Sequence, residues 1–204
     1  MNVRLLIVLC GFLGSVAQTQ AQEETLKGPF VGFSVGSFRY SETDESIGAK
    51  VADDTGVYRL LGGYRFTARM SLEASWARTG EIAASATVDD PLLGPARLDT
   101  RADLETLTVR VVGVKPYDRV VLFGGFGIYE AMLDEVGQFE DPFGVTTYTY
   151  HESDRGANLI GGVQFDVRPR VSVRAEYEWF DADSMGSDNN PSVWSAGVSV
   201  LFKF

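Results

Sequence analysis

Apolar residues occupy every second position along the last eleven residues of the chain, from Trp194 to Phe204. A period of two places successive side chains on opposite faces of a β-strand, here one apolar face and one small or polar face. At about 3.4 Å per residue and a tilt near 40°, such a strand rises about 26 Å, roughly the height of the apolar band of a membrane. The segment predicts a membrane-spanning strand, although the last strand of a soluble sheet would show the same alternation.

The same alternation recurs in seven earlier segments, and the links between the segments alternate in length. The seven segments cover about 30–40, 57–66, 70–79, 103–115, 119–133, 155–167 and 171–180. Links of about three residues follow the second, fourth and sixth segments, whereas the other links have about 11–23 residues. Tight periplasmic turns and long outer loops are typical of outer-membrane barrels. We predict an all-β protein, an eight-stranded antiparallel up-and-down transmembrane β-barrel over residues 30–204.

Large aromatic side chains lie on one face of these segments, and small or charged side chains lie on the other. An eight-stranded barrel has room inside only for close-packed side chains, so the rings are expected to face lipid. The rings expected to form an aromatic girdle are Tyr64, Phe66, Trp76, Tyr177, Trp179 and Trp194. A soluble lipocalin-like carrier, the competing interpretation, would bury these rings and stay in solution without detergent.

The charged residues of the inward face nearly balance. They are Arg59, Arg65, Glu73, Arg110, Arg174, Glu176, Glu178 and Lys203, with Asp166 as a further carboxylate. Because an unpaired charge is very costly inside a low-dielectric wall, we expect these side chains to form interlocked pairs that close the lumen. The alternative is that they line a narrow porin-like channel for small solutes.

Residues 1–21 have the features of a secretory signal peptide: one arginine, an apolar core and a small-residue cleavage site. We predict cleavage after Ala21, with Ala17 as the second choice. The apolar run is shorter than the roughly 20 residues that a membrane-spanning helix needs. Cleavage leaves 22–29 as a short N-terminal segment and removes Cys10, the one cysteine. Disulfides and cysteine metal sites are thereby excluded.

The charge balance excludes one class of partner. The chain has 28 acidic residues, and loss of the signal's arginine leaves 17 of its 18 basic ones. Such a chain would repel phosphate, so we expect no nucleic-acid partner. A mean hydropathy of −0.02 looks like that of a soluble domain. A transmembrane barrel is compatible with this average because only alternate residues meet lipid.

Residues 30–204 resemble the eight-stranded OmpA-type and opacity-type barrels of bacterial outer membranes, often called porin-like. The resemblance rests on "LLGGYRF", "LEASW", "GGFGIY", "GGVQFDV" and "VSVRAEYEWF", and on the final "VSVLFKF". In that last motif, Val198, Val200, Phe202 and Phe204 are similar to the signal that the barrel-assembly machinery recognises. The resemblance implies the bacterial outer membrane, contact with its lipid and lipopolysaccharide, a monomer, and a structural or surface-interaction role without enzyme activity. The resemblance leaves open whether the loops bind an extracellular ligand.

Two predicted loops are rich in carboxylates. The loop after the first strand carries Glu42, Asp44, Glu45, Asp53 and Asp54, and the loop 134–154 carries Glu135, Glu140, Asp141, Glu152 and Asp154. Clustered carboxylates can hold Ca²⁺ or Mg²⁺, but neither loop has the ligand spacing of a calcium-binding loop. We therefore predict no metal and no cofactor. The alternating aromatics of "TTYTYHES" either extend the strands above the bilayer or form a contact patch.

His151 is the only histidine, and with Ser153 it forms an H-x-S pair on one strand face. The pair faintly resembles the His-Ser pair of the outer-membrane lipid A deacylases. Such a hydrolase also needs an acid that orients the base, and Glu152 points to the other face. We predict no catalytic residue, and a lipid A-modifying hydrolase using His151 is the weakest alternative.

Overall fold

The computed structural model describes residues 27–44, 49–90, 94–181 and 192–204. The predicted signal peptide, with both cleavage sites, lies outside the described residues. Nine strands follow one another along the described chain: β1 (Gly28–Asp44), β2 (Ala49–Thr67), β3 (Met70–Thr79), β4 (Ile82–Asp90), β5 (Gly94–Tyr117), β6 (Val120–Asp141), β7 (Gly144–Arg168), β8 (Val171–Asp181) and β9 (Ser192–Lys203). No helix among these residues is long and apolar enough to span a membrane.

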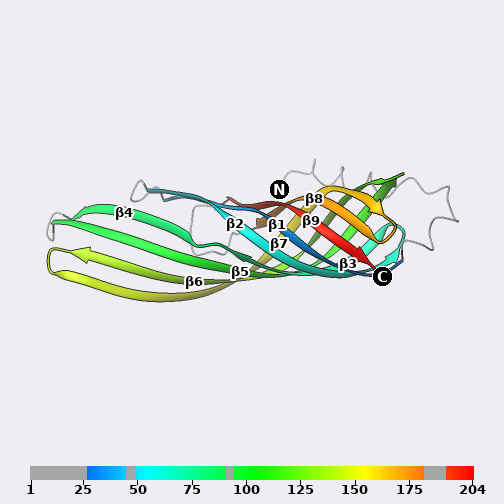
Figure 1. Ribbon diagram of the computed structural model, residues 1–204. Helices are drawn as coiled ribbons and strands as arrows, with labels where there is room; N and C mark the ends of the chain where they lie inside the picture. Colours follow the sequence, from blue (N-terminus) through cyan, green and yellow to red (C-terminus); the bar gives the residue numbers. More distant parts are fainter. Residues whose placement is uncertain (1–26, 45–48, 91–93, 182–191) are drawn as a thin grey trace, which may run out of the picture.

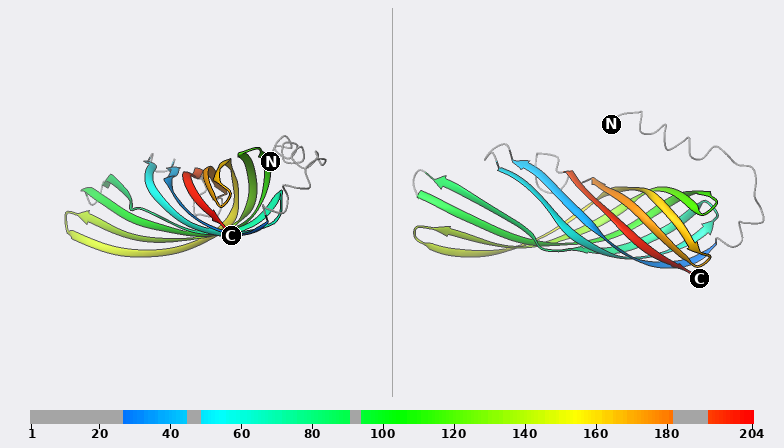
Figure 2. Two further views of the ribbon diagram at one scale, coloured as in Figure 1. Left: turned by 45° about the vertical axis from the view of Figure 1, so that its right-hand side comes forward. Right: turned by 45° about the horizontal axis from the view of Figure 1, so that its top comes forward.

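Eight of the strands close into an antiparallel barrel, which confirms the predicted fold class. Each strand pairs with its sequence neighbours, except that β3 pairs with β5 rather than with β4. Closure comes from β1, which pairs with β9 over twelve residues from Phe30 to Ser41. The remaining strand, β4, lies outside this ring of eight and pairs with β5 beyond the end of β3 (Figure 1). Figure 2 shows the curved wall of the barrel from two further directions.

The three tight turns close one rim of the barrel. Each turn leaves two residues outside the strands, one fewer than we expected from the sequence. Backbone hydrogen bonds link neighbouring hairpins along this rim, as from the Val114 amide to the Arg69 carbonyl at 2.8 Å and from the Asp166 amide to the Arg119 carbonyl at 2.8 Å. The ends of β1 and β9 meet at the same rim, where the Phe204 amide donates to the Pro29 carbonyl at 3.1 Å.

At the opposite end the strands are longer than the sequence predicted. The segment 80–102, expected as a loop, contains β4 and the first part of β5, and 134–154 belongs mostly to the β6–β7 hairpin. Hydrophobic alternation fades once both faces of a sheet meet water, whereas main-chain pairing continues and Thr, Tyr and Val still favour strands. The aromatics of "TTYTYHES" therefore extend β7, which was one of the two alternatives for this segment.

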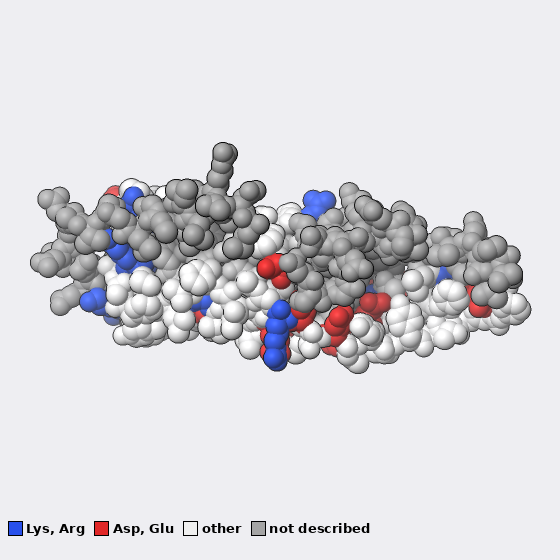
Figure 3. Space-filling view, turned by 180° about the vertical axis from the view of Figure 1, so that it is seen from behind, with Lys and Arg blue, Asp and Glu red and all other residues white. Residues whose placement is uncertain are grey.

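The outer face carries the large apolar side chains. Phe33, Leu60, Tyr64, Leu72, Phe126, Tyr177 and Phe202 are all exposed. The polar residues that alternate with them along each strand point inward and are buried, as at Ser34, Thr108 and Ser199. Such an apolar exterior around a polar interior is the arrangement of a barrel immersed in lipid. Seen from behind, much of the surface is uncharged, and Lys and Arg gather at the tight-turn end (Figure 3).

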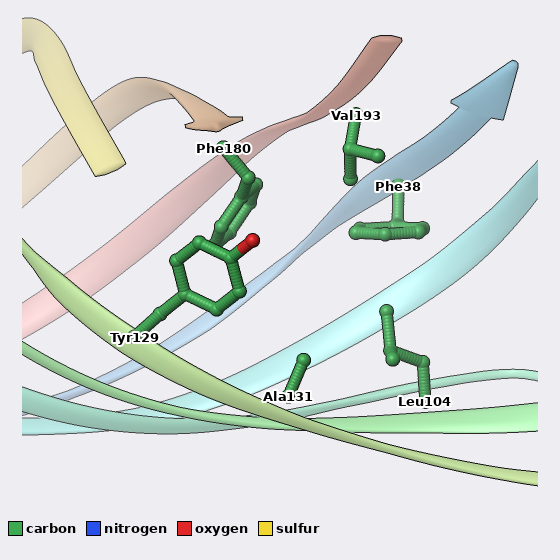
Figure 4. Close-up of a cluster of buried hydrophobic side chains, with 6 residues drawn as sticks. All are labelled: Phe38, Leu104, Tyr129, Ala131, Phe180 and Val193. Atoms are coloured by element: carbon green, nitrogen blue, oxygen red, sulfur yellow. The ribbon is translucent and has the colours of Figure 1, made fainter. Parts of the chain in front are cut away.

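The interior is less polar than the sequence suggested. Six buried residues form an apolar layer beyond the ion pairs, toward the long hairpins: Phe38, Leu104, Tyr129, Ala131, Phe180 and Val193 (Figure 4). A second layer lies on the wall formed by β5, β6 and β7, and a third, of Phe30, Leu61 and Leu201, lies near the tight turns. The small and charged residues expected on the inward face therefore share the lumen with large apolar side chains.

Glycine makes room for one of these inward rings. A Cβ atom at Gly162 of β7 would lie 2.7 Å from Cζ of Phe123 on β6. Real Cβ contacts essentially never fall below 3.0 Å, so the ring occupies the space that a larger residue would need. The same ring also supports the guanidinium of Arg174, whose Cζ lies 4.4 Å from the ring centroid. The wall, the ring and the arginine therefore pack as one layer.

Candidate functional site

Glu73 of β3 lies at the centre of the charged interior. Its carboxylate accepts hydrogen bonds from Nη1 and Nη2 of Arg174 at 2.9 and 3.0 Å, and from Nε of Arg110 at 3.2 Å. The side chains of Glu73 and Arg174 are 0% exposed and that of Arg110 is 1% exposed. A bidentate arginine–carboxylate pair combines charge with fixed geometry, and its planar fork holds both partners in place. Strands β3, β5 and β8 are thus joined across the lumen.

A second group of charges continues this network. Arg59 of β2 donates to Glu176 at 2.9 Å and pairs also with Glu178. Nη1 of Arg110 reaches Glu178 at 3.2 Å, so one arginine bridges the two groups. The Asn158 amide also donates to Glu178. Every carboxylate of the group therefore touches at least one cation, as low-dielectric surroundings require.

Two predicted members of the network lie apart from it, near the tight-turn rim. Lys203 pairs with Asp166, with 2.8 Å between Nζ and Oδ1. Arg65 is buried but makes no ion pair within 4 Å with a described residue, and its Nε has no hydrogen-bond partner. Among the eight predicted residues, the structure joins Arg59, Glu73, Arg110, Arg174, Glu176 and Glu178 into one cluster and leaves these two outside it.

The ion-pair cluster and the apolar layers lie at successive levels inside the described part of the barrel. Arg110, Arg174, Glu73 and Glu178 are among the largest fully buried side chains of the protein. On the side of the long hairpins lies the apolar layer around Phe38. In it the rings of Tyr129 and Phe180 meet edge-on, with 5.2 Å between their centroids. A solute entering from the outer end would first meet this apolar layer and then the ion pairs.

The residues of the predicted aromatic girdle lie on the outer face. Tyr64, Phe66, Tyr177 and Trp179 are exposed, whereas Trp76 and Trp194 are half-buried by neighbouring rings. Tyr177 stacks on Trp194 at 5.6 Å between centroids, and Tyr58 meets the edge of Trp76 at 5.7 Å. The predicted assembly-signal residues Val198, Val200, Phe202 and Phe204 are exposed on the same side of β9. Their roles as membrane anchors and assembly signal stay predictions.

A sheet formed by β4 to β7 projects well beyond the barrel (Figure 1). β7 alone has 25 residues, which at about 3.4 Å each span about 80 Å, whereas a tilted transmembrane strand needs about 10 residues. β8 pairs with β7 only up to Asn158, so residues 144–153 pair with β6 on one side and with no described strand on the other. This stretch is an open sheet edge within the described structure.

Apolar side chains accompany the open edge. The outer parts of β6 and β7 form the projecting hairpin. Its exposed apolar side chains are Val136, Phe143, Val145, Tyr148 and Tyr150. Phe143 at the tip is 81% exposed. An edge strand with apolar side chains and unpaired main-chain groups is a template for pairing with another chain.

His151 lies in this hairpin and has an acidic neighbour that the sequence did not reveal. Its Nδ1 is 2.5 Å from Oδ1 of Asp134, the residue opposite it on β6. Both side chains are about two-thirds exposed or more. No hydrogen bond joins His151 to Ser153 in the described structure. The histidine and its acid are therefore paired, and the third partner of a hydrolase is not in contact.

The carboxylates of the projecting hairpin do not gather around a common point. Among the described residues, no three His, Cys, Asp or Glu side chains lie together as a metal site would require.

The other carboxylate-rich segment, the predicted loop after the first strand, is described only in part. Its Asp54 pairs with Arg39 at 3.5 Å, and the side chains of Glu42, Asp44, Glu45 and Asp53 lie outside the described residues.

The chain belongs to the family described as outer membrane protein beta-barrel domain, whose sequence profile matches residues 7–204. Among solved structures it is similar to Neisserial surface protein A, at 15% identity and a TM-score of 0.56, over 87% of this chain and 97% of that one. It is also similar to Ail, the attachment invasion locus protein of Yersinia pestis, at 19% identity and a TM-score of 0.50, over 86% of this chain and 99% of that one. The N-terminal barrel of Pseudomonas aeruginosa OprF is similar at 12% identity and a TM-score of 0.54, over 87% of this chain and 99% of that one. No curated protein matches. At these identities the likeness shows the fold alone.

Proposed function

We propose that this outer-membrane protein acts as a surface-interaction barrel, anchored in lipid as a monomer and contacting a partner through its projecting sheet. The observation that carries the proposal is the stretch 144–153 of β7, which pairs on one side only and carries exposed Val145, Tyr148 and Tyr150. Main-chain groups at such an edge supply affinity for an extended segment, and alternate side chains supply specificity.

The charge of the sheet indicates what kind of partner fits it. Residues 97–105 and 130–155 contain ten carboxylates and three arginines. Electrostatic complementarity favours a partner segment that combines apolar and basic side chains and disfavours a polyanion. Ail has been solved with the heparin analogue sucrose octasulfate. We expect that sulfated sugar to bind this chain weakly.

The filled lumen supports this function over solute conduction. A narrow channel would need a continuous polar path, and the fully buried cluster around Glu73 together with the apolar layer around Phe38 leaves little room for one. Lipid, lipopolysaccharide and the barrel-assembly machinery remain the partners that we propose for the barrel wall and for β9.

The proposal is tested by shortening the hairpin without disturbing the barrel. Glu135 and Tyr150 face each other in the β6–β7 register, so residues 136–149 can be replaced by Asn-Gly, a sequence that favours a two-residue hairpin turn. The probe is a fluorescent peptide of alternating lysine and valine, with sucrose octasulfate as the polyanion control. We expect the full chain in detergent to bind the peptide and the shortened chain to lose most of that binding.

A matched variant separates the edge from the general charge of the sheet. Glu140→Gln with Asp141→Asn lowers the negative charge at the tip but keeps the hairpin, so binding should weaken only modestly. Both variants must keep the heat-modifiable gel mobility of a folded barrel. Equal peptide binding by the full and the shortened chain, or tight binding of the sulfated sugar through the hairpin, would refute the proposal.

A further inference from the structure

One buried cation of the lumen has no carboxylate in contact. The inward cations are Arg59, Arg65, Arg110, Arg174 and Lys203, and the carboxylates near them are Glu73, Asp166, Glu176 and Glu178. A further buried carboxylate, that of Asp154, lies in the apolar layer, where it accepts a hydrogen bond from Tyr129 at 3.1 Å. Each of the four carboxylates near the cations contacts at least one cation other than Arg65. Among these cations, only Arg65 contacts none of the described carboxylates.

Arg65 is buried without a counter-ion. Its residue is 4% exposed, and no ion pair within 4 Å joins it to any described carboxylate, that of Phe204 included. The two carboxylates that attract Arg65 electrostatically, those of Asp166 and Glu73, already have other partners. Oδ1 of Asp166 accepts from Lys203, Ser172 and Gln164, and both oxygens of Glu73 accept from Arg174. Nε of Arg65 has no hydrogen-bond partner, and neither has Nε of Arg174.

Both arginines line one small cavity at the tight-turn rim. Its volume is about 20 Å³, and Lys27 and Lys203 contribute two further cations to the lining, beside the apolar Phe30 and Leu201. A cavity of about 10–15 Å³ on this measure holds one water molecule. The cavity therefore has room for a single ion of chloride size and not for a whole phosphate. Its lining supplies N–H donors, cations and apolar walls. The lining also includes Phe204, whose terminal carboxylate makes no ion pair within 4 Å with a described cation.

We propose that this cavity binds a small monovalent anion, with chloride as the expected occupant, and that Arg65 is its principal ligand. A guanidinium is weakly hydrated and always charged, so it cannot lose its charge on burial as other groups do. A bound anion would supply a counter-charge beside Arg65 and a partner for its free N–H group. It would also connect β2 with β8 and β9 at the rim, because Arg65, Arg174 and Lys203 come from these strands.

The experiment measures chloride binding to the full folded chain in a non-ionic detergent, by the excess linewidth of the chlorine NMR signal. Arg65→Gln removes the charge and keeps most of the side-chain volume. The matched control is Arg69→Gln, an exposed arginine four residues further on, in the turn at the same rim. We expect the excess linewidth to fall at least tenfold in Arg65→Gln and to stay within a factor of two in Arg69→Gln. Equal linewidths in Arg65→Gln and the wild type would overturn the proposal.

Competition tests the size of the site. Bromide should remove the excess linewidth of the wild type, since a halide of similar size fits the cavity. Phosphate at the same ionic strength should leave it largely unchanged. Displacement by phosphate as effective as that by bromide would contradict a chloride-sized site and point to binding at the exposed arginines of the rim.

A second measurement needs no variant, in case Arg65→Gln does not fold. Anything that binds the folded state alone raises the unfolding midpoint. The wild type should therefore unfold at a higher temperature in sodium chloride than in sodium gluconate of equal ionic strength, because gluconate is too large for the cavity. Identical midpoints in the two salts would refute anion binding. Peptide binding by the projecting hairpin should be the same in both salts, so this test is independent of the proposed function.

Discussion

Arg174 of β8 and Glu73 of β3 form a bidentate ion pair across the lumen, with 2.9 and 3.0 Å between the donor nitrogens and the acceptor oxygens. The two residues are 101 positions apart in the chain, and both side chains are 0% exposed. A further arginine, Arg110, shares the same carboxylate. Removing this one carboxylate would therefore leave two buried cations without their main partner.

Glu73→Gln is accordingly expected to destabilise the barrel strongly. Breaking a buried ion pair from one side costs about 3–5 kcal/mol, because the remaining charge is left buried and uncompensated. Urea unfolding of the protein in detergent or lipid measures the change in the free energy of unfolding. The control is Glu105→Gln, which removes a half-exposed partner of Arg78 and should cost about 1 kcal/mol or less. Similar losses for both variants would contradict a central role for Glu73.

Gly162→Ala should also destabilise the barrel, for steric reasons. The new methyl group would meet the ring of Phe123 at 2.7 Å and the backbone oxygen of Ala175 closer still, and overpacking of this kind costs about 1–3 kcal/mol. At the neighbouring Gly161, the nearest atom to a new Cβ is the Phe123 oxygen at 3.8 Å, an ordinary contact. Gly161→Ala should be nearly neutral in the same unfolding assay. A neutral Gly162→Ala would mean that the ring moves away without cost.

The projecting hairpin should show a pH-dependent contact. Burial and the hydrogen bond that Tyr148 Oη donates to Glu135, 3.0 Å long, raise the pKa of the Tyr148 phenol above its usual value. A raised pKa means that the folded state favours the protonated phenol. The contact is therefore fully present below the ordinary tyrosine pKa and is lost as the pH rises through the raised one.

Glu135→Gln should lower the pKa of Tyr148 toward its usual value, since the negative charge beside the phenol is removed. The near-ultraviolet titration of the wild type minus that of Tyr148→Phe isolates the signal of this phenol, and the same subtraction in the Glu135→Gln background gives the shifted one. An unchanged titration would show that the hydrogen bond is absent in solution.

The buried side chains of the lumen predict electrical silence. In planar bilayers the wild type should produce no single-channel steps, because a solute would meet the apolar layer around Phe38 and the buried ion pairs around Glu73. Regular steps would support the narrow channel that the sequence left open. In that case, reversing the charge of Glu73 should change their size.

The pairing of His151 with Asp134 calls for a direct test of hydrolase activity. We expect expression of the protein in a host strain to leave its lipid A acylation unchanged, because Ser153 makes no hydrogen bond to the histidine. Mass spectrometry of extracted lipid A gives the answer. Loss of an acyl chain with the wild type, but not with Ser153→Ala, would establish an enzyme.

Much of the charged interior was accessible from the alternation of residue types. Inward positions such as Arg174 and Glu176 were identifiable because each strand face has a period of two. The same parity marks Phe180 as inward, two residues beyond Glu178, and marks Phe38 four residues beyond Ser34. The apolar layer was therefore within reach of the sequence, but the sequence analysis assigned neither ring to a face.

Other features could not be reached from the sequence. The acid beside His151 lies on another strand, and only the register between β6 and β7 places Asp134 opposite it. The isolation of Arg65 depends on which carboxylates the other cations occupy. β4 was missed because both faces of a sheet that stands in water can be polar.

The chain by itself determined a membrane barrel with an aromatic outer face, because lipid on one side and a narrow lumen on the other impose one repeated pattern on every strand. Only the tertiary structure decided that Glu73 meets Arg174, that Arg65 meets no carboxylate, and that the sheet continues beyond the barrel. These relations depend on strand register and on the stagger between strands, which set the height of each side chain in the lumen and which a pattern along a single strand does not contain.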